Sequence, residues 1–435
     1  MRVGVIGAGI TGLALADQFA RSGAEVTVFE RGHEVGGLAG GFEVLPGIRL
    51  EHFYHHMFQT DTDIQTLMTE LGIADSLRWN PVNIGFYIDD GIARLSTPAD
   101  VLRFRSLPVL SRLALGWTML ELQRRPTQGG LARITVEQFF RRRLARKVFD
   151  TMWAPMYEAK WGPDARKISA AWMWQKVRAR GRSRRGAREE LAYPIGGFGG
   201  IAEALAVRAR EAAAKICLGV EIERITTHDG RVTGVETSHG AQPFDAVLST
   251  LPLPNLLKLI ALPEPAASIC AGIAYRGVVC HVLVMDRPLS DIYWLNIADS
   301  SIPLGGIVEH TNFVPADHYE GKHIAYLFNY LSQDAPELTM DDDAFIGHHF
   351  PHVKKIFPAF AGAHVERRFV FRTRFATPVY RHPYQQPPQQ PMPGLWLADT
   401  SQIFPMDRGT SECIRLARHL ARQALGLPST APRPI

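Results

Sequence analysis

Residues 2–30 read RVGVIGAGITGLALADQFARSGAEVTVFE. The first five of them form a short apolar run, which predicts a buried strand. The glycine-rich turn GAGITG follows at residues 7–12, and an apolar-periodic segment then predicts a helix that ends near Ser22, before Gly23. Residues 25–30 (EVTVFE) predict a second strand. The order of strand, glycine turn, helix and strand predicts the βαβ unit of an α/β fold that binds a dinucleotide.

Each glycine in the turn has a physical task. Gly7 permits a tight turn, Gly9 lets the backbone approach a pyrophosphate, and Gly12 permits close packing of the helix on the strand. The helix directs free N–H groups and the positive end of its dipole at the phosphates. Glu30 ends the second strand, where its carboxylate can accept hydrogen bonds from ribose hydroxyls and disfavours a 2′-phosphate. The cofactor contacts predicted in this unit are Gly7, Gly9, Ile10, Thr11, Gly12 and Glu30.

A second glycine-rich segment begins directly after Glu30. Residues 31–40 read RGHEVGGLAG, a loop that can run close along an extended cofactor. The segment resembles the second glycine motif of the glutathione-reductase-type flavoproteins, in the branch of the amine oxidases, phytoene desaturases and protoporphyrinogen oxidases. The resemblance implies FAD as the cofactor and adds four expected contacts, Arg31, Gly36, Gly37 and Leu38.

Three later segments match the same branch in the same order. Residues 219–221 (GVE) begin a strand, residues 244–250 (FDAVLST) form a buried strand, and residues 394–399 (GLWLAD) form the last strand. The resemblance implies that the backbone of Val220 meets the adenine. It also implies that Asp399 contacts the ribityl–pyrophosphate part of FAD.

The chain continues after Asp399 with TSQIFPMDRGTSECIRLARHLARQALG, residues 400–426. Apolar residues at 413, 416, 417, 420, 421 and 424 define one face of a helix that begins near Gly409. In the family that the chain resembles, this helix points its N-terminus at the flavin, where its dipole stabilises the negative charge of the reduced ring. The resemblance therefore implies a lip beneath the flavin that consists of Met406, Asp407, Arg408 and Gly409.

Long insertions separate the segments that match the nucleotide fold. We therefore expect a discontinuous FAD-binding domain of the glutathione-reductase-type Rossmann fold at residues 1–77, 190–258 and 388–426. Residues 78–189 are expected to form a helical substrate or lid subdomain, with helices at 107–124, 135–147 and 169–178. Residues 259–387 carry alternating runs, which predict an antiparallel sheet of the substrate domain over one flavin face. Residues 427–435 predict a disordered tail.

Composition limits the kind of protein. Hydrophobic residues make up 46% and charged residues 21%, which is typical of a globular protein. The net charge is +5, from 39 Arg and 9 Lys against 43 acidic residues, and the densest charge is residues 178–188, RARGRSRRGAR. This run lacks interleaved aromatic side chains, so no nucleic acid partner is expected, and the run is interpreted as a solvated loop or as a clamp for an anionic substrate. The four cysteines lack metal-ligand spacing, so we expect reduced thiols in a cytoplasmic protein and no metal site.

The predicted helix at residues 107–124, LPVLSRLALGWTMLELQR, has two interpretations. We favour a helix that packs in the core. The alternative is an element at a membrane surface, so membrane contact is expected to be peripheral at most. No lysine lies in a motif that is expected to face the flavin, so the lysine–water arrangement of many amine oxidases is not predicted.

Residues 50–61 read LEHFYHHMFQTD and follow the second glycine motif, so we expect them near the flavin. Adjacent histidines of an extended chain point to opposite faces, which argues against a metal site. Imidazole can shuttle a proton near neutral pH, so His55 and His56 are predicted to be catalytic. Histidines that pack on the flavin domain without chemistry are the alternative.

The histidine segment also resembles a segment of the UDP-galactopyranose mutases. Residues 157–163 (YEAKWGP), 307–313 (IVEHTNF) and 404–407 (FPMD) resemble further segments of that family. The resemblance implies an anionic, nucleotide-sugar-like substrate, a clamp of arginines and a role for a tyrosine. Tyr330 and Arg374 are the predicted catalytic candidates, with Arg178 and Arg372 as other candidates for the clamp.

The sequence as a whole predicts an FAD-dependent oxidoreductase that transfers a hydride from a small organic substrate to flavin N5. A sugar-nucleotide mutase that uses the reduced N5 as a nucleophile is the alternative. A flavoprotein whose FAD is only structural is the third possibility.

Overall fold

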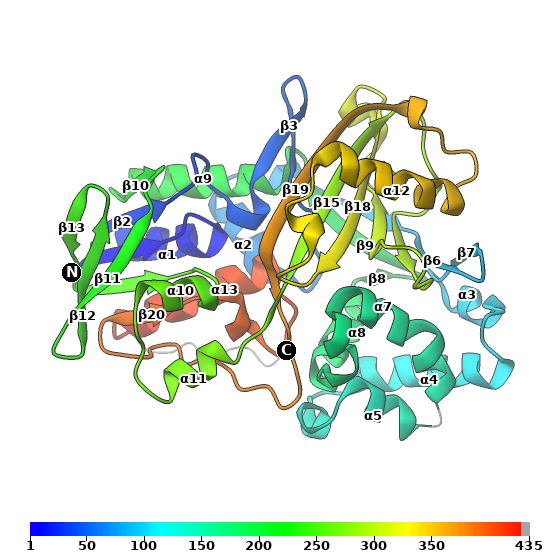
Figure 1. The fold of residues 1–435 in the computed structure, drawn as a ribbon, viewed down its shortest axis with the longest axis horizontal. Helices are drawn as coiled ribbons and strands as arrows, with labels where there is room; N and C mark the ends of the chain where they lie inside the picture. Colours follow the sequence, from blue (N-terminus) through cyan, green and yellow to red (C-terminus); the bar gives the residue numbers. More distant parts are fainter. Residues whose placement is uncertain (144, 428–435) are drawn as a thin grey trace.

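The computed structural model describes residues 1–143 and 145–427 of the chain. Apart from Leu427, the predicted tail at residues 427–435 therefore lies outside the described residues. A five-stranded parallel sheet carries the amino-terminal βαβ unit (Figure 1). In sheet order its strands are β10 (Lys215–Leu218), β2 (Glu25–Glu30), β1 (Arg2–Ile6), β14 (Ala246–Ser249) and β20 (Leu395–Leu397). Because the strands are parallel, the turn after β1 and the loop after β2 meet at one edge of the sheet.

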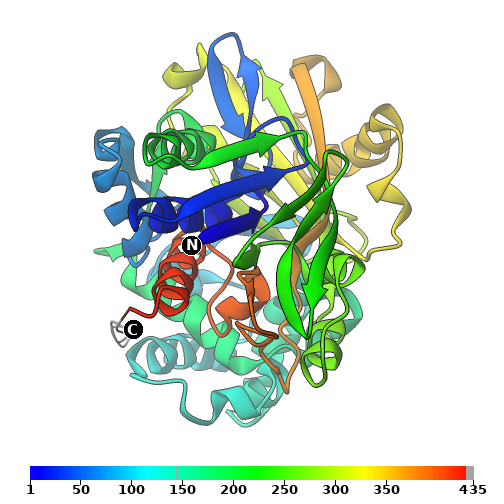
Figure 2. The same ribbon diagram turned by 90° about the vertical axis from the view of Figure 1, so that its left-hand side faces the viewer.

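Two different layers cover the faces of this sheet (Figure 2). Val3 and Val5 of β1 pack toward a helical layer of α1 (Ile10–Arg21), α9 (Gly197–Glu211) and α13 (Thr410–Ala424). Ile6 and Phe29 belong to a core on the other face, with a β-meander of β11 (Ile222–His228), β12 (Arg231–Thr237) and β13 (Gly240–Pro243). Successive side chains of a strand point to opposite faces, which explains why Val5 and Ile6 enter different cores.

A second, seven-stranded sheet stands beside the first. Its order is β19 (Val365–Pro378), β15 (Tyr275–Met285), β18 (His323–Leu331), β17 (Gly306–Glu309), β16 (Trp294–Ile297), β6 (Ile84–Ile88) and β7 (Gly91–Arg94). All neighbours are antiparallel except β16 and β6, which pair in parallel. A shorter pairing joins β3 (Gly41–Leu45) to β4 (Ile48–Glu51). In another, β9 (Arg188–Pro194) pairs with β5 (Leu77–Val82) on one side and with β8 (Arg184–Arg185) on the other.

The start of the range 78–189 differs from the helical expectation. Strands β6 and β7 complete the seven-stranded sheet, and most of β5 also falls in this range. The sheet is therefore not purely antiparallel and not confined to residues 259–387. Strand β6 pairs its backbone with β16, which lies more than two hundred residues away in the chain. No local pattern of the sequence indicates such a partner.

Helices fill the range between β7 and β8. Its helices are α3 (Pro98–Arg103), α4 (Val109–Arg124), α5 (Val136–Arg141), α6 (Arg146–Val148), α7 (Ala154–Trp161) and α8 (Ala170–Arg182). They share a core of their own, which includes Phe139, Phe140 and Trp161. The other helices are α2 (Thr62–Glu70), α10 (Leu253–Leu259), α11 (Ala266–Ala271) and α12 (Asp342–Ile356). Within the described part of the chain, no helix combines the length and the apolar composition that crossing a membrane requires.

A buried ion pair joins the helices behind the glycine turn. The guanidinium of Arg208 on α9 donates to both carboxylate oxygens of Asp17 on α1, at 2.8 and 2.7 Å, and Asp17 is only 1% exposed. Arg208 also contacts Glu70 of α2, which in turn binds Arg418 of α13. Because two hydrogen bonds fix the planar guanidinium, this network holds α1 in a defined orientation above the sheet.

Candidate functional site

The glycine turn after β1 has the geometry that a pyrophosphate site requires. Gly7 has a φ of +104°, and a Cβ atom on Gly12 would lie 1.9 Å from the carbonyl oxygen of Gly7. These two glycines are therefore required by the turn itself. At Gly9 the φ is −71° and a Cβ atom would approach no other protein atom closer than 3.9 Å. Gly9 is the N-cap of α1 and provides no side-chain cap, so the N–H groups of the first turn, at Ile10 and Thr11, remain directed at a ligand.

The second glycine loop packs directly on this turn. Gly36 has a φ of +112°, and its N–H donates to the carbonyl oxygen of Ala8 at 2.8 Å. A Cβ atom on Gly37, which has a φ of +58°, would lie 3.2 Å from the Cα of Gly9. Only glycine permits this close approach of two backbone segments. The two motifs therefore form one continuous wall.

Glu30 closes this wall at the end of β2. Its carboxylate accepts hydrogen bonds from the N–H groups of Ala8, at 2.9 Å, and Gly32, at 2.8 Å. The N–H of Val220 donates to the backbone oxygen of Glu30 at 2.9 Å, which places Val220 beside the same strand end. Arg31 is exposed next to this group. The structure thus brings the predicted nucleotide contacts together at one edge of the sheet.

Asp399 anchors the chain where it enters the C-terminal segment. Its carboxylate accepts hydrogen bonds from the hydroxyl of Tyr275, at 2.5 Å, and the N–H of Ser401, at 2.8 Å. Burial raises the pKa of Asp399. Because Asp399 is buried and tied from two sides, it fixes the direction of the chain toward the lip at Met406–Gly409.

A cavity of about 3030 Å³ lies beyond this anchor, among the lip, the helical part and the seven-stranded sheet. Of the residues predicted from the sequence, it is lined by Leu38, His55, His56, Tyr330, Met406, Asp407, Arg408 and Gly409. Helix α13 begins at this cavity, and its N-cap, Gly409, provides no side-chain cap. The open N-terminus suits a reduced flavin, which carries negative charge. The glycine wall and this lip therefore fit FAD.

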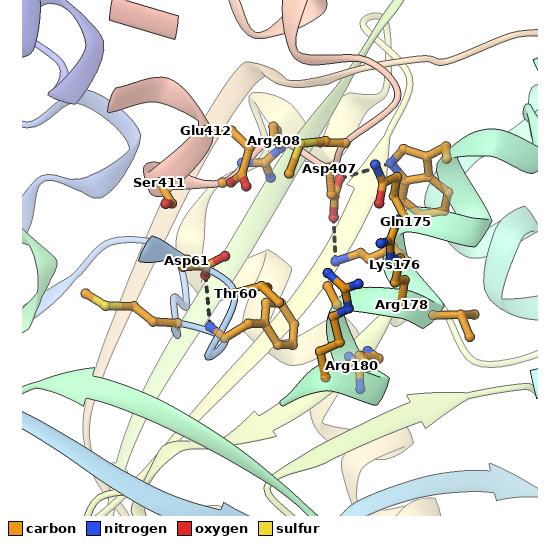
Figure 3. Close-up of a pocket in the computed structure, with 18 of the residues that line it drawn as sticks. Thr60, Asp61, Gln175, Lys176, Arg178, Arg180, Asp407, Arg408, Ser411 and Glu412 are labelled. Atoms are coloured by element: carbon orange, nitrogen blue, oxygen red, sulfur yellow. Dashed lines mark hydrogen bonds and ion pairs between the residues drawn. The ribbon is translucent and has the colours of Figure 1, made fainter. Parts of the chain in front are cut away.

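Asp407 lies at the centre of a group of charges in the cavity (Figure 3). Its carboxylate is 2.5 Å from Nζ of Lys176 and 3.8 Å from Nζ of Lys160, and it accepts a hydrogen bond from the indole of Trp172 at 3.2 Å. Burial disfavours the carboxylate, but the two lysines outweigh this effect and hold the pKa of Asp407 below its usual value. Burial lowers the pKa of Lys160.

Sequence reasoning assigned no role to either lysine, although Lys160 lies in the segment 157–163 that resembles the mutases. No lysine lies in a sequence motif expected to face the flavin, but α7 and α8 bring Lys160 and Lys176 to the lip. One signal was present in the sequence, since lysine is rare in this arginine-rich chain, with 9 Lys against 39 Arg. A lysine that persists in such a composition is a candidate for a task that arginine performs poorly.

Tyr330 forms a hydroxyl pair that the sequence did not predict. Its hydroxyl lies 3.0 Å from that of Tyr54, and Nζ of Lys160 lies 5.7 Å from its ring centre. Burial opposes ionisation of Tyr330, but the charges of Lys160 and Arg408 outweigh burial, so the pKa of Tyr330 lies below its ordinary value. Burial raises the pKa of Tyr54. Tyr330 is therefore the more acidic member of the pair.

The two predicted histidines line the cavity as neutral groups. Nδ1 of His55 lies 2.6 Å from the carbonyl oxygen of Phe53, and Nδ1 of His56 lies 3.0 Å from the hydroxyl of Tyr293. Burial lowers the pKa of His55 to about 4 and holds the pKa of His56 well below its usual value. Both rings are therefore uncharged at neutral pH, which makes them weak proton acceptors.

The structure does not bring Arg374 to the cavity. Arg374 is exposed on β19 and donates to the backbone oxygen of Gln333. Arg372 is engaged by Asp342 at 2.6 Å. Neither Arg372 nor Arg374 lines the cavity, whereas Arg178 of α8 does. An arginine clamp at residues 372 and 374 therefore has no support.

A carboxyl group is buried directly behind the histidine segment. Glu51 is 0% exposed, and its carboxylate accepts a hydrogen bond from the hydroxyl of Tyr193 at 2.7 Å. Its second oxygen has no hydrogen-bond partner among the described residues. Burial raises the pKa of Glu51 from about 4.5 to about 7.

Replacing Glu51 by Gln is expected to remove a pH dependence of stability. Between about pH 4.5 and about pH 7 the unfolded chain releases the proton and the folded chain retains it, so wild-type stability falls as the pH rises. A glutamine side chain has no such proton, so the variant should be more stable than the wild type by about 3 kcal/mol at about pH 8 and similar to it below about pH 4.5. Urea unfolding across this range measures the difference, and the exposed Glu34→Gln serves as control. Parallel pH profiles of wild type and variant would contradict the burial of a protonated Glu51.

The fold and the site together define an FAD-dependent oxidoreductase. A model of the family of flavin containing amine oxidoreductases matches residues 10–409. The chain belongs to this family.

Solved structures share the fold across nearly the whole chain. A structure assigned as a protoporphyrinogen oxidase from Exiguobacterium sp. 255-15 is 18% identical, with a TM-score of 0.74, and the match covers 97% of this chain and 98% of that one. Reduced UDP-galactopyranose mutase is 16% identical, with a TM-score of 0.77, and covers 100% and 98%. Putrescine oxidase bound to putrescine is 14% identical, with a TM-score of 0.71, and covers 98% and 99%.

A curated relative matches over a shorter stretch. Coproporphyrinogen III oxidase of Staphylococcus aureus (strain NCTC 8325 / PS 47) is 26% identical over 176 residues. The chain spans 38% of the length of this relative in that match, which is also 38% of the chain itself.

Proposed function

We propose that the protein oxidises a small organic substrate whose hydride is accepted at N5 of bound FAD. The observation that carries this proposal is the hydroxyl pair of Tyr54 and Tyr330, 3.0 Å apart at the cavity wall. A group that takes a proton from the substrate must be exposed to the cavity and acidic enough to exist in its basic form. Tyr330 lines the cavity, and although burial opposes its ionisation, the charges of Lys160 and Arg408 lower its pKa below the ordinary value, which favours the phenolate.

The two tyrosines and Lys160 have separate parts in the proposed reaction. Tyr330 accepts the O–H or N–H proton of the substrate at its Oη as the hydride leaves the neighbouring carbon. Tyr54 donates a hydrogen bond to that oxygen while it carries charge. Lys160 is a positioning residue, since its ammonium group lies over the rings of Trp161, Trp172 and Tyr330 and stabilises the phenolate without touching the substrate.

The cavity favours a substrate that combines an apolar body with an anionic group. Its walls include many aromatic and methionine side chains, among them Trp153, Trp174, Met152 and Met156. The last turns of α8 and the residues after it add five cations, Lys176, Arg178, Arg180, Arg182 and Arg184. Arg178 is 5% exposed, and its Nε has no hydrogen-bond partner among the described residues. A carboxylate or phosphate of the substrate would supply that partner. The name of the Staphylococcus aureus relative contains coproporphyrinogen III, and this compound is one candidate substrate to test.

Replacing Tyr330 by Phe is expected to slow the reduction of bound flavin by about a hundredfold, because the proton acceptor is lost. In the wild type the rate should rise with pH as Tyr330 ionises, at a pH below the ordinary pKa of tyrosine, and the Phe variant should lack this rise. Anaerobic stopped-flow mixing of the oxidised holoenzyme with anionic apolar substrates measures both quantities.

Two different outcomes would contradict two different parts of this proposal. If the reduced enzyme isomerises a nucleotide sugar with no net oxidation of its flavin, the protein is a mutase and the hydride proposal is wrong. An unchanged rate and pH profile in Tyr330→Phe, with flavin reduction intact in the wild type, would overturn the role of Tyr330 alone.

A further inference from the structure

The outer face of α4 and the end of α3 expose an unusual amount of apolar surface. Six of the ten large apolar side chains that are exposed among the described residues lie here: Leu102, Val109, Leu110, Leu113, Trp117 and Leu120. Leu110 is 80% and Trp117 is 70% exposed. We call these six residues the apolar face. Contiguous apolar surface of this kind marks a site of contact with a partner.

The spacing within α4 shows that the apolar face is one side of the helix. Val109, Leu113, Trp117 and Leu120 recur at intervals of three and four residues, so they lie on the same side. The opposite side, with Leu115 and Leu122, packs in the helical core. The favoured sequence interpretation, a helix packed in the core, is therefore wrong for this outer side. Figure 1 shows α3 and α4 at the edge of the molecule, away from the five-stranded sheet.

The charge around the apolar face is strongly positive. Residues 98–150 contain eleven Lys and Arg against four Asp and Glu. Two of these acids are already neutralised, because Glu121 binds Arg143 at 2.7 Å and Glu137 binds Arg141 at 2.7 Å. Arg103 and Arg105 are exposed between Leu102 and Val109 of the face, and Arg124 is exposed at the end of α4.

The apolar face is continuous with the cavity. Leu102, Leu113, Trp117 and Leu120 also line the cavity that contains the lip and the cations of α8. The face is therefore the apolar rim of the cavity mouth. An apolar molecule could pass from a surface that covers the face into the cavity without crossing water.

We propose that the apolar face docks on the surface of an anionic lipid bilayer. An apolar helix side flanked by arginines matches such a surface, since leucine and tryptophan enter the acyl boundary and the cations meet anionic headgroups. A second copy of the chain fits less well. In a two-fold interface the same patch meets itself, so the basic surroundings of two copies would face each other and repel. Docking does not depend on the reaction proposed above.

The test is flotation of the holoenzyme with vesicles of phosphatidylcholine and phosphatidylglycerol, compared with vesicles of phosphatidylcholine alone. We expect the wild type to float with the mixed vesicles, and less with the neutral ones or in high salt. The triple variant Leu110→Ser, Leu113→Ser, Trp117→Ser should lose at least about tenfold in vesicle affinity, because three apolar anchors are removed. The control Val207→Ser removes another exposed apolar side chain, on α9, and should float like the wild type.

Flavin content and thermal unfolding report whether the triple variant folds. If it does not, Arg103→Glu with Arg105→Glu tests the same surface, and this variant should bind the mixed vesicles at least about tenfold more weakly because two headgroup contacts are reversed. The proposal is overturned if the wild type does not float with the mixed vesicles, or if the folded variants float like the wild type. It is also overturned if the wild type forms a dimer that the triple variant abolishes, since the face is then an interface between copies.

Discussion

Replacing Gly9 by Ala or Val is expected to abolish FAD binding and the yellow colour of the protein while the fold stays intact. The φ of Gly9, −71°, is open to any residue, and a Cβ atom there would meet no other protein atom within 3.9 Å. A side chain would instead occupy the space in front of the α1 N-terminus, where the pyrophosphate must approach the backbone. Loss of two charge-assisted hydrogen bonds corresponds to about 4 kcal/mol, or roughly a thousandfold in affinity.

Titration of the apoprotein with FAD, together with circular dichroism, separates binding from folding in this variant. Gly200→Ala is the matched control, because a Cβ atom at Gly200 on α9 meets nothing within 4 Å and is likewise free of steric conflict. It should retain FAD. Gly12→Ala should behave differently from both, because its Cβ atom would collide with the backbone of Gly7 and disturb the turn. A Gly9→Val protein that keeps normal FAD affinity would show that the pyrophosphate does not lie at this turn.

Replacing Asp407 by Asn is expected to destabilise the protein by about 3 to 5 kcal/mol. The change leaves Lys160 and Lys176 without their shared counter-charge in a cavity wall where these lysines are 21% and 29% exposed. Breaking a buried ion pair by removal of one partner has a cost in this range, because the remaining charge stays poorly solvated. The lip should also loosen, since Asp407 is the link between the C-terminal segment and helices α7 and α8.

A double-mutant cycle in urea unfolding measures this link. Asp407→Asn combined with Lys176→Met should be less destabilising than the sum of the single changes by at least about 1 kcal/mol, because the uncompensated charge is removed together with its partner. The control is Glu236→Gln, which breaks the Arg224–Glu236 pair of 2.6 Å on the surface and should hardly change the unfolding midpoint. Strict additivity of the two changes at residues 176 and 407 would contradict the coupling.

Local sequence patterns predicted the nucleotide-binding part well. The strand–turn–helix order of residues 2–30 became β1, α1 and β2, because glycine positions and apolar periods act within a few residues of chain. The same reasoning failed at β6, whose partner β16 lies in a distant segment, and at β7, which joins the sheet only through β6. It was incomplete at α4, whose inner side packs in the helical core as expected while its outer side is exposed, because apolar residues on a helix have the same pattern whether they meet a core or a surface.

The sequence by itself determined the βαβ unit with its glycine turn, the second glycine loop after it and the C-terminal helix. Those features depend on glycine positions in turns and on the periodicity of apolar residues, which residues close together in the sequence determine. Only the tertiary structure decided the chemistry of the cavity, since Tyr54, Lys160, Lys176, Tyr330 and Asp407 come from five separate segments. Only the tertiary structure showed that Arg374 lies outside that cavity and that the apolar face lies at the cavity mouth. The physical reason is that burial, pKa and contact depend on which distant side chains share a space, and no local pattern encodes that.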